Sequence, residues 1–270
     1  MKYMIIAGFL ALTLYSCKKT TSLPEYNSDP VVTAYLSAGR TITLKLTHQA
    51  STSSTVFSSP ALTGLDLIIR CGDSTYHLTD TGGAVYTNAA LILEAGKQYD
   101  LSFVYNGKTV TAAAIIPSRP ADVTQSATTI SVDKIDSTTT GGGFGGPGNM
   151  TEPVEITWTN NDASYYVIVV ENLETNPERI IDTSANVDTG RVFRNSPVTT
   201  GTYDITSRSF KYFGAHRIVL YHIRPDYALL YDNSSSSSQS LSTPANGITN
   251  GVGIFTGVNA DTLYLQVNKK

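Results

Sequence analysis

The sequence has 270 residues, of which 41% are hydrophobic and 15% charged, and its formal net charge is −3 at pH 7. This length suffices for two modest domains, and the small net charge, without a basic cluster larger than two lysines, argues against a nucleic-acid partner. Abundant Thr, Ser, Tyr, Val and Ile favour strands over helices, so we expect an all-β protein.

The N-terminal segment has the pattern of an export signal. A nearly continuous apolar run covers residues 3–15 after the basic Lys2. It is too short to span a bilayer, which takes about 20 residues, so we interpret residues 1–16 as a signal peptide. The run ends in Leu14-Tyr15-Ser16-Cys17, which resembles the lipobox of bacterial lipoproteins. That resemblance implies cleavage before Cys17 and acylation of its thiol, and residues 17–30 would then form the lipidated cysteine and a tether. The alternative is an ordinary secretory signal that is cleaved elsewhere.

Residues 31–118 are expected to form an N-terminal β-sandwich. The run 41–47 places Ile42, Leu44 and Leu46 on one face and Thr or Lys on the other, which is the period-2 pattern of a half-buried strand. Further strands are expected at residues 31–36, 65–71, 74–78 and 84–87, with a hairpin turn at Gly72-Asp73.

A tyrosine corner and a hairpin complete this unit. Leu93, Gly96, Tyr99 and Leu101 have the spacing of a corner in which the phenol hydroxyl bonds to backbone a few residues upstream. Strands 99–105 and 108–116 are expected to pair across Asn106-Gly107, a strong hairpin signal. The unit is similar to immunoglobulin or transthyretin-like sandwiches.

Residues 119–153 are expected to connect the two units, and residues 154–270 to form a C-terminal β-sandwich. The connecting segment holds one candidate strand, 129–132, and a glycine-rich stretch, 141–148, that offers no side chains to a core.

In the second unit, Val154, Ile156 and Trp158 share one face of a strand. Residues 165–170 and 217–223 are apolar on both faces, which predicts central strands. A last strand is expected at 262–267. The Trp-bearing strand followed by a Tyr-Tyr-Val strand is similar to fibronectin type III modules.

Two catalytic motifs are matched only in part. Asp80-Thr81-Gly82 and Asp188-Thr189-Gly190 resemble the paired loops of aspartic peptidases, but lack the flanking hydrophobic pair and serine, so we interpret them as turns. Ser131 and Lys134 match Ser-x-x-Lys, with a Ser-x-Asn at 184–186, but no Lys-Thr-Gly follows. We therefore predict no catalytic residues and no enzyme activity.

No metal or cofactor site is predicted. His216 and His222 lie on one face of a strand but about 20 Å apart, too far to share a metal, so we expect local hydrogen bonds for both. Cys71, the only cysteine besides Cys17, ends a predicted strand and is expected to be a buried small apolar side chain.

The tyrosines are the one pattern that indicates a binding surface. Aromatic rings with a polar tip are favoured at binding surfaces, although they also pack well in sheets. The candidate surface comprises five aromatic residues of the second unit: Tyr212, Phe213, Tyr221, Tyr227 and Tyr231.

Residues 221–227 (YHIRPDY) and 244–257 (PANGITNGVGIFTG) resemble a Bacteroidota family of outer-membrane lipoproteins of unknown function, often encoded beside TonB-dependent receptors. The lipobox and the corner-and-hairpin fit the same family in the same order. The resemblance implies a lipid anchor at Cys17 in the outer membrane and a possible TonB-dependent receptor β-barrel as partner.

We therefore expect a non-catalytic accessory or binding component of such a receptor. The alternative is a cell-surface glycan-binding or adhesive module. Lys18-Lys19 stand where surface-exported lipoproteins often have acidic residues, so the membrane face stays open.

Overall fold

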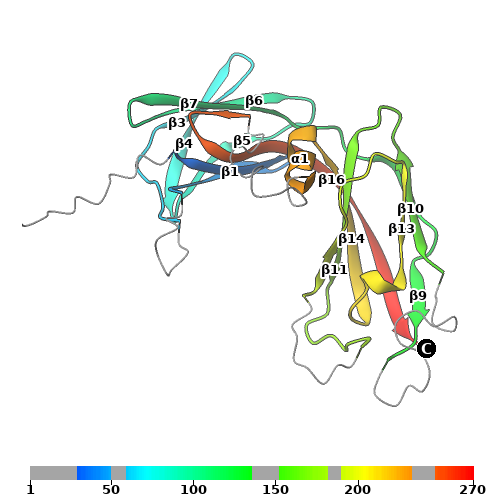
Figure 1. The fold of residues 1–270 in the computed structure, drawn as a ribbon. Coiled ribbons are helices and arrows are strands. Elements are labelled where there is room, and N and C mark those ends of the chain that lie inside the picture. Colours follow the sequence, from blue (N-terminus) through cyan, green and yellow to red (C-terminus); the bar gives the residue numbers. More distant parts are fainter. Residues whose placement is uncertain (1–28, 50–58, 136–151, 182–189, 233–246) are drawn as a thin grey trace, which may run out of the picture.

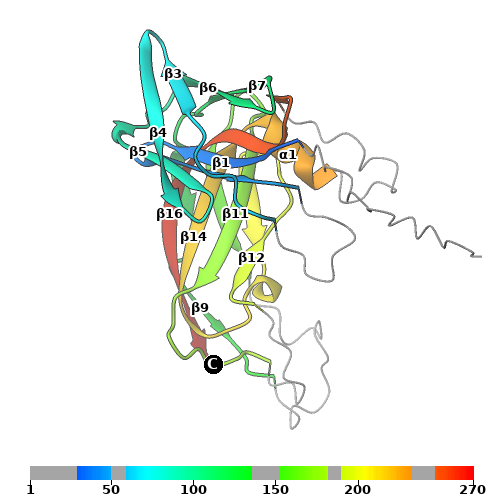
Figure 2. The same ribbon diagram turned by 90° about the vertical axis from the view of Figure 1, so that its left-hand side faces the viewer.

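The computed structural model describes residues 29–49, 59–135, 152–181, 190–232 and 247–270. Within these ranges the regular secondary structure is almost entirely strand, with one α-helix and one short 3-10 helix. Two sandwich-like units meet at an angle, and their strands run in clearly different directions (Figures 1 and 2). The predicted all-β fold with two sandwiches is confirmed.

The first unit has two layers. One layer contains β16, β1, β2, β5 and the end of β4, and the other contains the start of β4 followed by β3, β6, β7 and β15. The bounds of these strands, apart from β16, are β1 (Val31–Ser37), β2 (Thr41–Thr47), β3 (Leu67–Cys71), β4 (Ser74–Gly82), β5 (Val85–Ile92), β6 (Gln98–Tyr105), β7 (Lys108–Ile115) and β15 (Ile248–Thr249).

The core of this unit follows the alternation in the sequence. Ile42, Leu44 and Leu46 of β2 are fully buried, while the Thr and Lys between them are exposed. This happens because successive side chains of a strand point to opposite faces of the sheet. Cys71 is half-buried at the end of β3, packed against the same core.

The tyrosine corner and its hairpin form as predicted. The hydroxyl oxygen of Tyr99 accepts a hydrogen bond of 2.8 Å from the backbone N–H of Glu94. β6 and β7 pair along their whole length up to Tyr105 and Lys108. Asn106 and Gly107, between them, have φ angles of 47° and 73°. Two positive φ angles in a two-residue loop match the twist of the flanking strands, which is why Asn-Gly favours this hairpin.

The second unit also has two layers. β12, β11, β14 and β16 form one layer, with β9 beside the far end of β16, and β13, β10 and β8 form the other. The elements are β8 (Ala121–Gln125), β9 (Thr129–Val132), β10 (Val154–Thr159), β11 (Tyr165–Asn172), β12 (Val192–Arg194), β13 (Thr202–Ile205), the 3-10 helix η1 (Ser207–Ser209), β14 (Gly214–Ile223) and the helix α1 (Pro225–Asp232).

The second core lies between these layers. Val154, Ile156 and Trp158 of β10 all face it, as predicted, and the Trp158 ring lies 5.2 Å from the ring of Tyr166 on β11. β11 and β14 each have hydrogen-bonded neighbours on both sides, as their two-sided apolar sequences predicted.

β16 (Val252–Lys269) belongs to both units. Its residues 252–258 pair in parallel with β1, and its residues 258–267 pair antiparallel with β14. An extended strand of this length spans about 60 Å, and Figure 1 shows it passing from the first unit into the second. A single hydrogen-bonded sheet therefore runs from β12 to β15, and backbone pairing couples the two units.

Strand pairing and packing place several residues in a different unit from the one that the sequence predicted. Ile248 and Phe255, near the C-terminus, pack in the first core. β8 and β9 lie within the expected connecting segment 119–153, but pair with β10 and β16 of the second unit. The glycine-rich stretch 141–148 and the serine run 234–238 lie outside the described residues.

Candidate functional site

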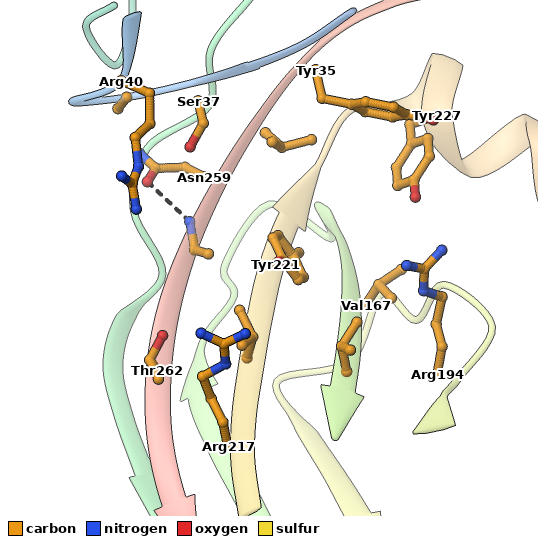
Figure 3. Close-up of a pocket in the computed structure, with 15 residues that line it drawn as sticks. Tyr35, Ser37, Arg40, Val167, Arg194, Arg217, Tyr221, Tyr227, Asn259 and Thr262 are labelled. Carbon is orange, nitrogen blue, oxygen red and sulfur yellow. Dashed lines mark hydrogen bonds between the residues drawn. The ribbon is translucent and has the colours of Figure 1, made fainter. Parts of the chain in front are cut away.

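A groove lies at the corner where the two units meet. Its volume is about 670 Å³, within the range of about 300–1,000 Å³ that is usual for small-molecule sites. It is lined by Tyr35, Ser37, Ala38, Arg40, Val167, Val169, Arg194, Arg217, Val219, Tyr221, Tyr227, Val258, Asn259, Ala260 and Thr262 (Figure 3). Strands of both units contribute, so the groove exists only because β1 and β14 lie on either side of β16.

The floor is the outward face of the second unit. Strand alternation turns Ile218 and Leu220 of β14 into the second core, so the intervening Val219 and Tyr221 face the groove. Pairing with β16 places Tyr221 beside Ala260 and Val219 beside Thr262. The floor is therefore a sheet surface on which nearly buried valines lie among Tyr221 and polar side chains such as Asn259 and Thr262.

Aromatic rings form one end of the groove. Tyr35 of β1 and Tyr227 of α1 meet edge to face with ring centroids 5.6 Å apart, and Tyr231 packs against Tyr227 at 5.9 Å. Tyr35 remains 49% exposed, so it presents a free ring surface. Burial raises the pKa of both Tyr35 and Tyr227 above the ordinary value. Both phenols are therefore neutral at pH 7 and keep their O–H groups.

Helix α1 positions this aromatic end. Pro225 occupies its first position, where the fixed φ of proline suits the helix and no intrahelical N–H is needed. Ala228 of the helix packs on Ile223 and Val258 of the sheet. This contact holds Tyr227 over the edge of the groove.

Three arginines surround the floor. Arg217 donates a hydrogen bond to the carboxylate of Glu171, and this ion pair raises the pKa of the guanidinium. Arg40 lies at the end of the β1–β2 turn, and Arg194 ends β12. Figure 3 shows these two on opposite sides of the groove, with Tyr221 and Arg217 between them. Neither Arg40 nor Arg194 forms an ion pair with another described residue.

This arrangement can bind a ligand but offers no catalytic pair. The described residues that line the groove include no Asp, Glu, His or Cys, so Ser37 has no general base beside it. In the described ranges no group of three or more His, Cys, Asp or Glu could hold a metal ion. The available chemistry is aromatic and apolar contact, hydrogen bonding by the polar lining residues and attraction of negative charge.

The predicted aromatic surface is brought together only in part. Tyr221 and Tyr227 line the groove, and Tyr231 lies beside Tyr227. The prediction was wrong for Tyr212 and Phe213, which are only 6% and 7% exposed. The backbone of Tyr212 bridges to Arg179 and that of Phe213 bonds to Glu178, which turns the Phe213 ring into the second core.

Sequence reasoning missed four groove residues: Tyr35, Arg40, Arg194 and Arg217. They come from three different strands and one turn, and no spacing relates them. The helix that carries Tyr227 did have a signal, because Pro225 followed by Asp226 is a typical helix start.

The remaining candidates have local structural roles where they are described. The Asp80 carboxylate accepts hydrogen bonds from the backbone N–H groups of Gly82 (2.8 Å) and Gly64 (2.9 Å), which lower its pKa. Asp80 lies in β4, where it pairs with Tyr86 of β5, so its interpretation as a turn residue was wrong; the turn follows at residues 83–84. Ser131 lies in β9. Cys17, the signal peptide, Asp188 and the Ser-x-Asn at 184–186 lie outside the described residues.

Both histidines of β14 are held by nearby side chains and backbone oxygens. His216 contacts the backbone oxygen of Gly214 (3.0 Å) and the side-chain nitrogen of Asn172 (3.2 Å). His222 contacts the backbone oxygen of Ser118 (2.9 Å) and stacks on Tyr166 with centroids 4.7 Å apart. The predicted local hydrogen bond is confirmed for His216, whereas the partner of His222 is 104 residues away along the chain.

Comparison with known proteins identifies no family. No family model matches the sequence, and no curated protein matches it. Among solved structures, the chain is similar to domains A168–A170 of titin, with 10% sequence identity and a TM-score of 0.21, over 90% of this chain and 67% of that one. A likeness this weak carries no argument, so the fold assignment rests on the strand pairings. None of the helices in the described ranges has the length and apolar character needed to cross a membrane.

Proposed function

We propose that the protein is a non-catalytic binding component, lipid-anchored in the outer membrane, that serves a TonB-dependent receptor. The observation that supports the binding role is the groove, which combines a sheet floor, three tyrosines and three arginines without an acid–base or nucleophile–base pair among its described lining residues. The anchor rests on the lipobox that ends at Cys17 and on the family resemblance given above.

The position of the tether suits this role. The described chain enters the first unit at Pro30, just before β1, and β1 carries Tyr35 of the groove. If Cys17 holds the lipid, the 14 residues to Val31 can extend at most about 50 Å. The groove would then remain close to the membrane that holds the receptor.

The experiment compares Cys17→Ser with Cys71→Ser, which removes the only other cysteine. We expect the native protein and Cys71→Ser to fractionate with the outer membrane, and Cys17→Ser to be released. Mild-detergent purification of the native protein should also bring down a large β-barrel receptor. Membrane association of Cys17→Ser would refute the anchor, and isolation of the native protein alone would refute the receptor partnership.

The alternative, a cell-surface glycan-binding or adhesive module, is favoured by the exposed ring of Tyr35, since aromatic surfaces suit sugars. It shares the anchor but requires no receptor. Ligand binding by a protein that purifies without a β-barrel would support this alternative.

A further inference from the structure

The groove is a local concentration of positive charge on a protein whose overall charge is negative. Three of its 15 lining residues are arginines and none is acidic, although acidic residues outnumber Lys and Arg in the whole chain by 22 to 19. Glu171 neutralises Arg217, whereas no described carboxylate pairs with Arg40 or Arg194; the Arg194 guanidinium instead forms a hydrogen bond with the Tyr231 hydroxyl, which leaves its positive charge in place. A groove lined by one sign of charge attracts ligands of the opposite sign.

Two arginines on opposite sides of the floor indicate a ligand with separated negative groups. The guanidinium is a planar fork that matches carboxylate geometry, so each of Arg40 and Arg194 can hold one acid group. Tyr221 lies between them and Tyr35 and Tyr227 stand at one end (Figure 3). A ligand held in this way would place its body on the sheet floor and the aromatic rings, with its acid groups reaching the sides.

The floor does not suit an extended peptide. β14 provides Arg217, Val219 and Tyr221, and it is hydrogen-bonded to β11 on one side and β16 on the other. Its backbone groups are thus unavailable for strand addition, the usual way in which a sheet takes up a peptide. A ligand that offers ring faces and hydroxyl groups fits better, since Tyr rings stack on such faces and Ser37 and Thr262 can bond hydroxyls.

We propose that the groove binds an acidic oligosaccharide, a short sugar chain whose carboxylate groups contact Arg40 and Arg194 while a sugar ring packs on Tyr35. This inference rests on the proposed function only in taking the groove as the binding site. It adds the chemical class of the ligand, and it does not depend on the lipid anchor or on the receptor.

The test uses trigalacturonate and its methyl ester, which keeps the sugar rings but loses the charges. Calorimetry on the native protein should show binding of the acid at least tenfold tighter than binding of the ester, and weaker binding as salt rises. Arg40→Gln and Arg194→Gln should each weaken binding about fivefold, which is typical of an exposed charge pair. The double variant should lose about 25-fold, because the two side chains act independently.

Arg70→Gln is the matched control, because Arg70 is an exposed arginine of β3 away from the groove and its loss changes the net charge equally. It should bind like the native protein. Equal affinity for acid and ester, no binding of either, an equal loss in Arg70→Gln, or binding of hexaglutamate in place of the sugar would overturn the proposal. Receptor co-purification is scored separately, so either proposal can fail while the other stands.

Discussion

Gly257 of β16 lies directly against the backbone carbonyl of Ile115 at the end of β7, and a Cβ at Gly257 would overlap that oxygen. Four residues earlier, Gly253 has a φ of 114°, and a Cβ there would lie 2.0 Å from the carbonyl oxygen of Val32 on β1. The glycines of the 244–257 segment thus allow β16 to pass close to two other strands on its way between the units. A side chain at either position would push β16 away from its neighbours.

We expect Gly257→Ala to lower the free energy of unfolding by about 3 kcal/mol, because the clash is with backbone and cannot be relieved by a rotamer change. Urea unfolding measures this loss. Gly247→Ala is the control, since Gly247 has an ordinary φ and nothing within 4 Å of an added Cβ. Equal stability of the two variants would contradict the close approach.

The tyrosine corner should be worth about 1 kcal/mol. Tyr99→Phe keeps the buried ring but removes the oxygen that accepts the Glu94 N–H, leaving a partly buried donor unpaired. Tyr264→Phe, on an exposed ring of β16, should leave the unfolding midpoint unchanged. A Tyr99→Phe protein as stable as the native one would show that this hydrogen bond contributes nothing.

Thr256→Val should stabilise the protein by about 1 kcal/mol. Thr256 is 0% exposed, and its hydroxyl has no hydrogen-bond partner among the described residues. Replacing an unpaired buried hydroxyl by a methyl group of similar shape removes a desolvation cost. Thermal unfolding of the two proteins at equal concentration tests this, and a less stable Thr256→Val would indicate that the hydroxyl is paired, for example with a buried water.

Stability should fall as the pH decreases below about 6.5. Burial lowers the pKa of His216, against the opposing effects of the Gly214 carbonyl and the Glu174 carboxylate. With a native pKa below the unfolded value of 6.5, the unfolded chain binds more protons in this window, so acidification favours unfolding. Protonation of His216 would also place the Nε2–H group against the side-chain NH2 group of Asn172, so that two donors would face each other.

His216→Gln isolates this effect, because the variant retains the other three histidines. Urea unfolding at pH 7.5 and pH 5.0 should show a smaller loss of stability on acidification in the variant than in the native protein. An identical loss in both proteins would assign the pH dependence to other groups.

The sequence by itself determined most strands and their turns. Alternation in Thr41–Thr47, the Asn106-Gly107 turn and the Tyr99 corner are all local signals, because each depends on residues that are close along the chain. The two-sandwich class followed from many such signals in series. Of the tyrosines that the sequence singled out, Tyr221 and Tyr227 do line a concave surface.

Only the tertiary structure decided which strands share a sheet and which side chains meet. β16 was predicted as a short strand of one unit, but it pairs with β1 in one and β14 in the other, because glycines let its first half approach backbone closely. The same pairing brings Tyr35 to Tyr227 and places Arg40 and Arg194 around one floor, whereas Tyr212 and Phe213 turn inward. Residues so distant in sequence meet through long-range backbone pairing, and no local pattern encodes that.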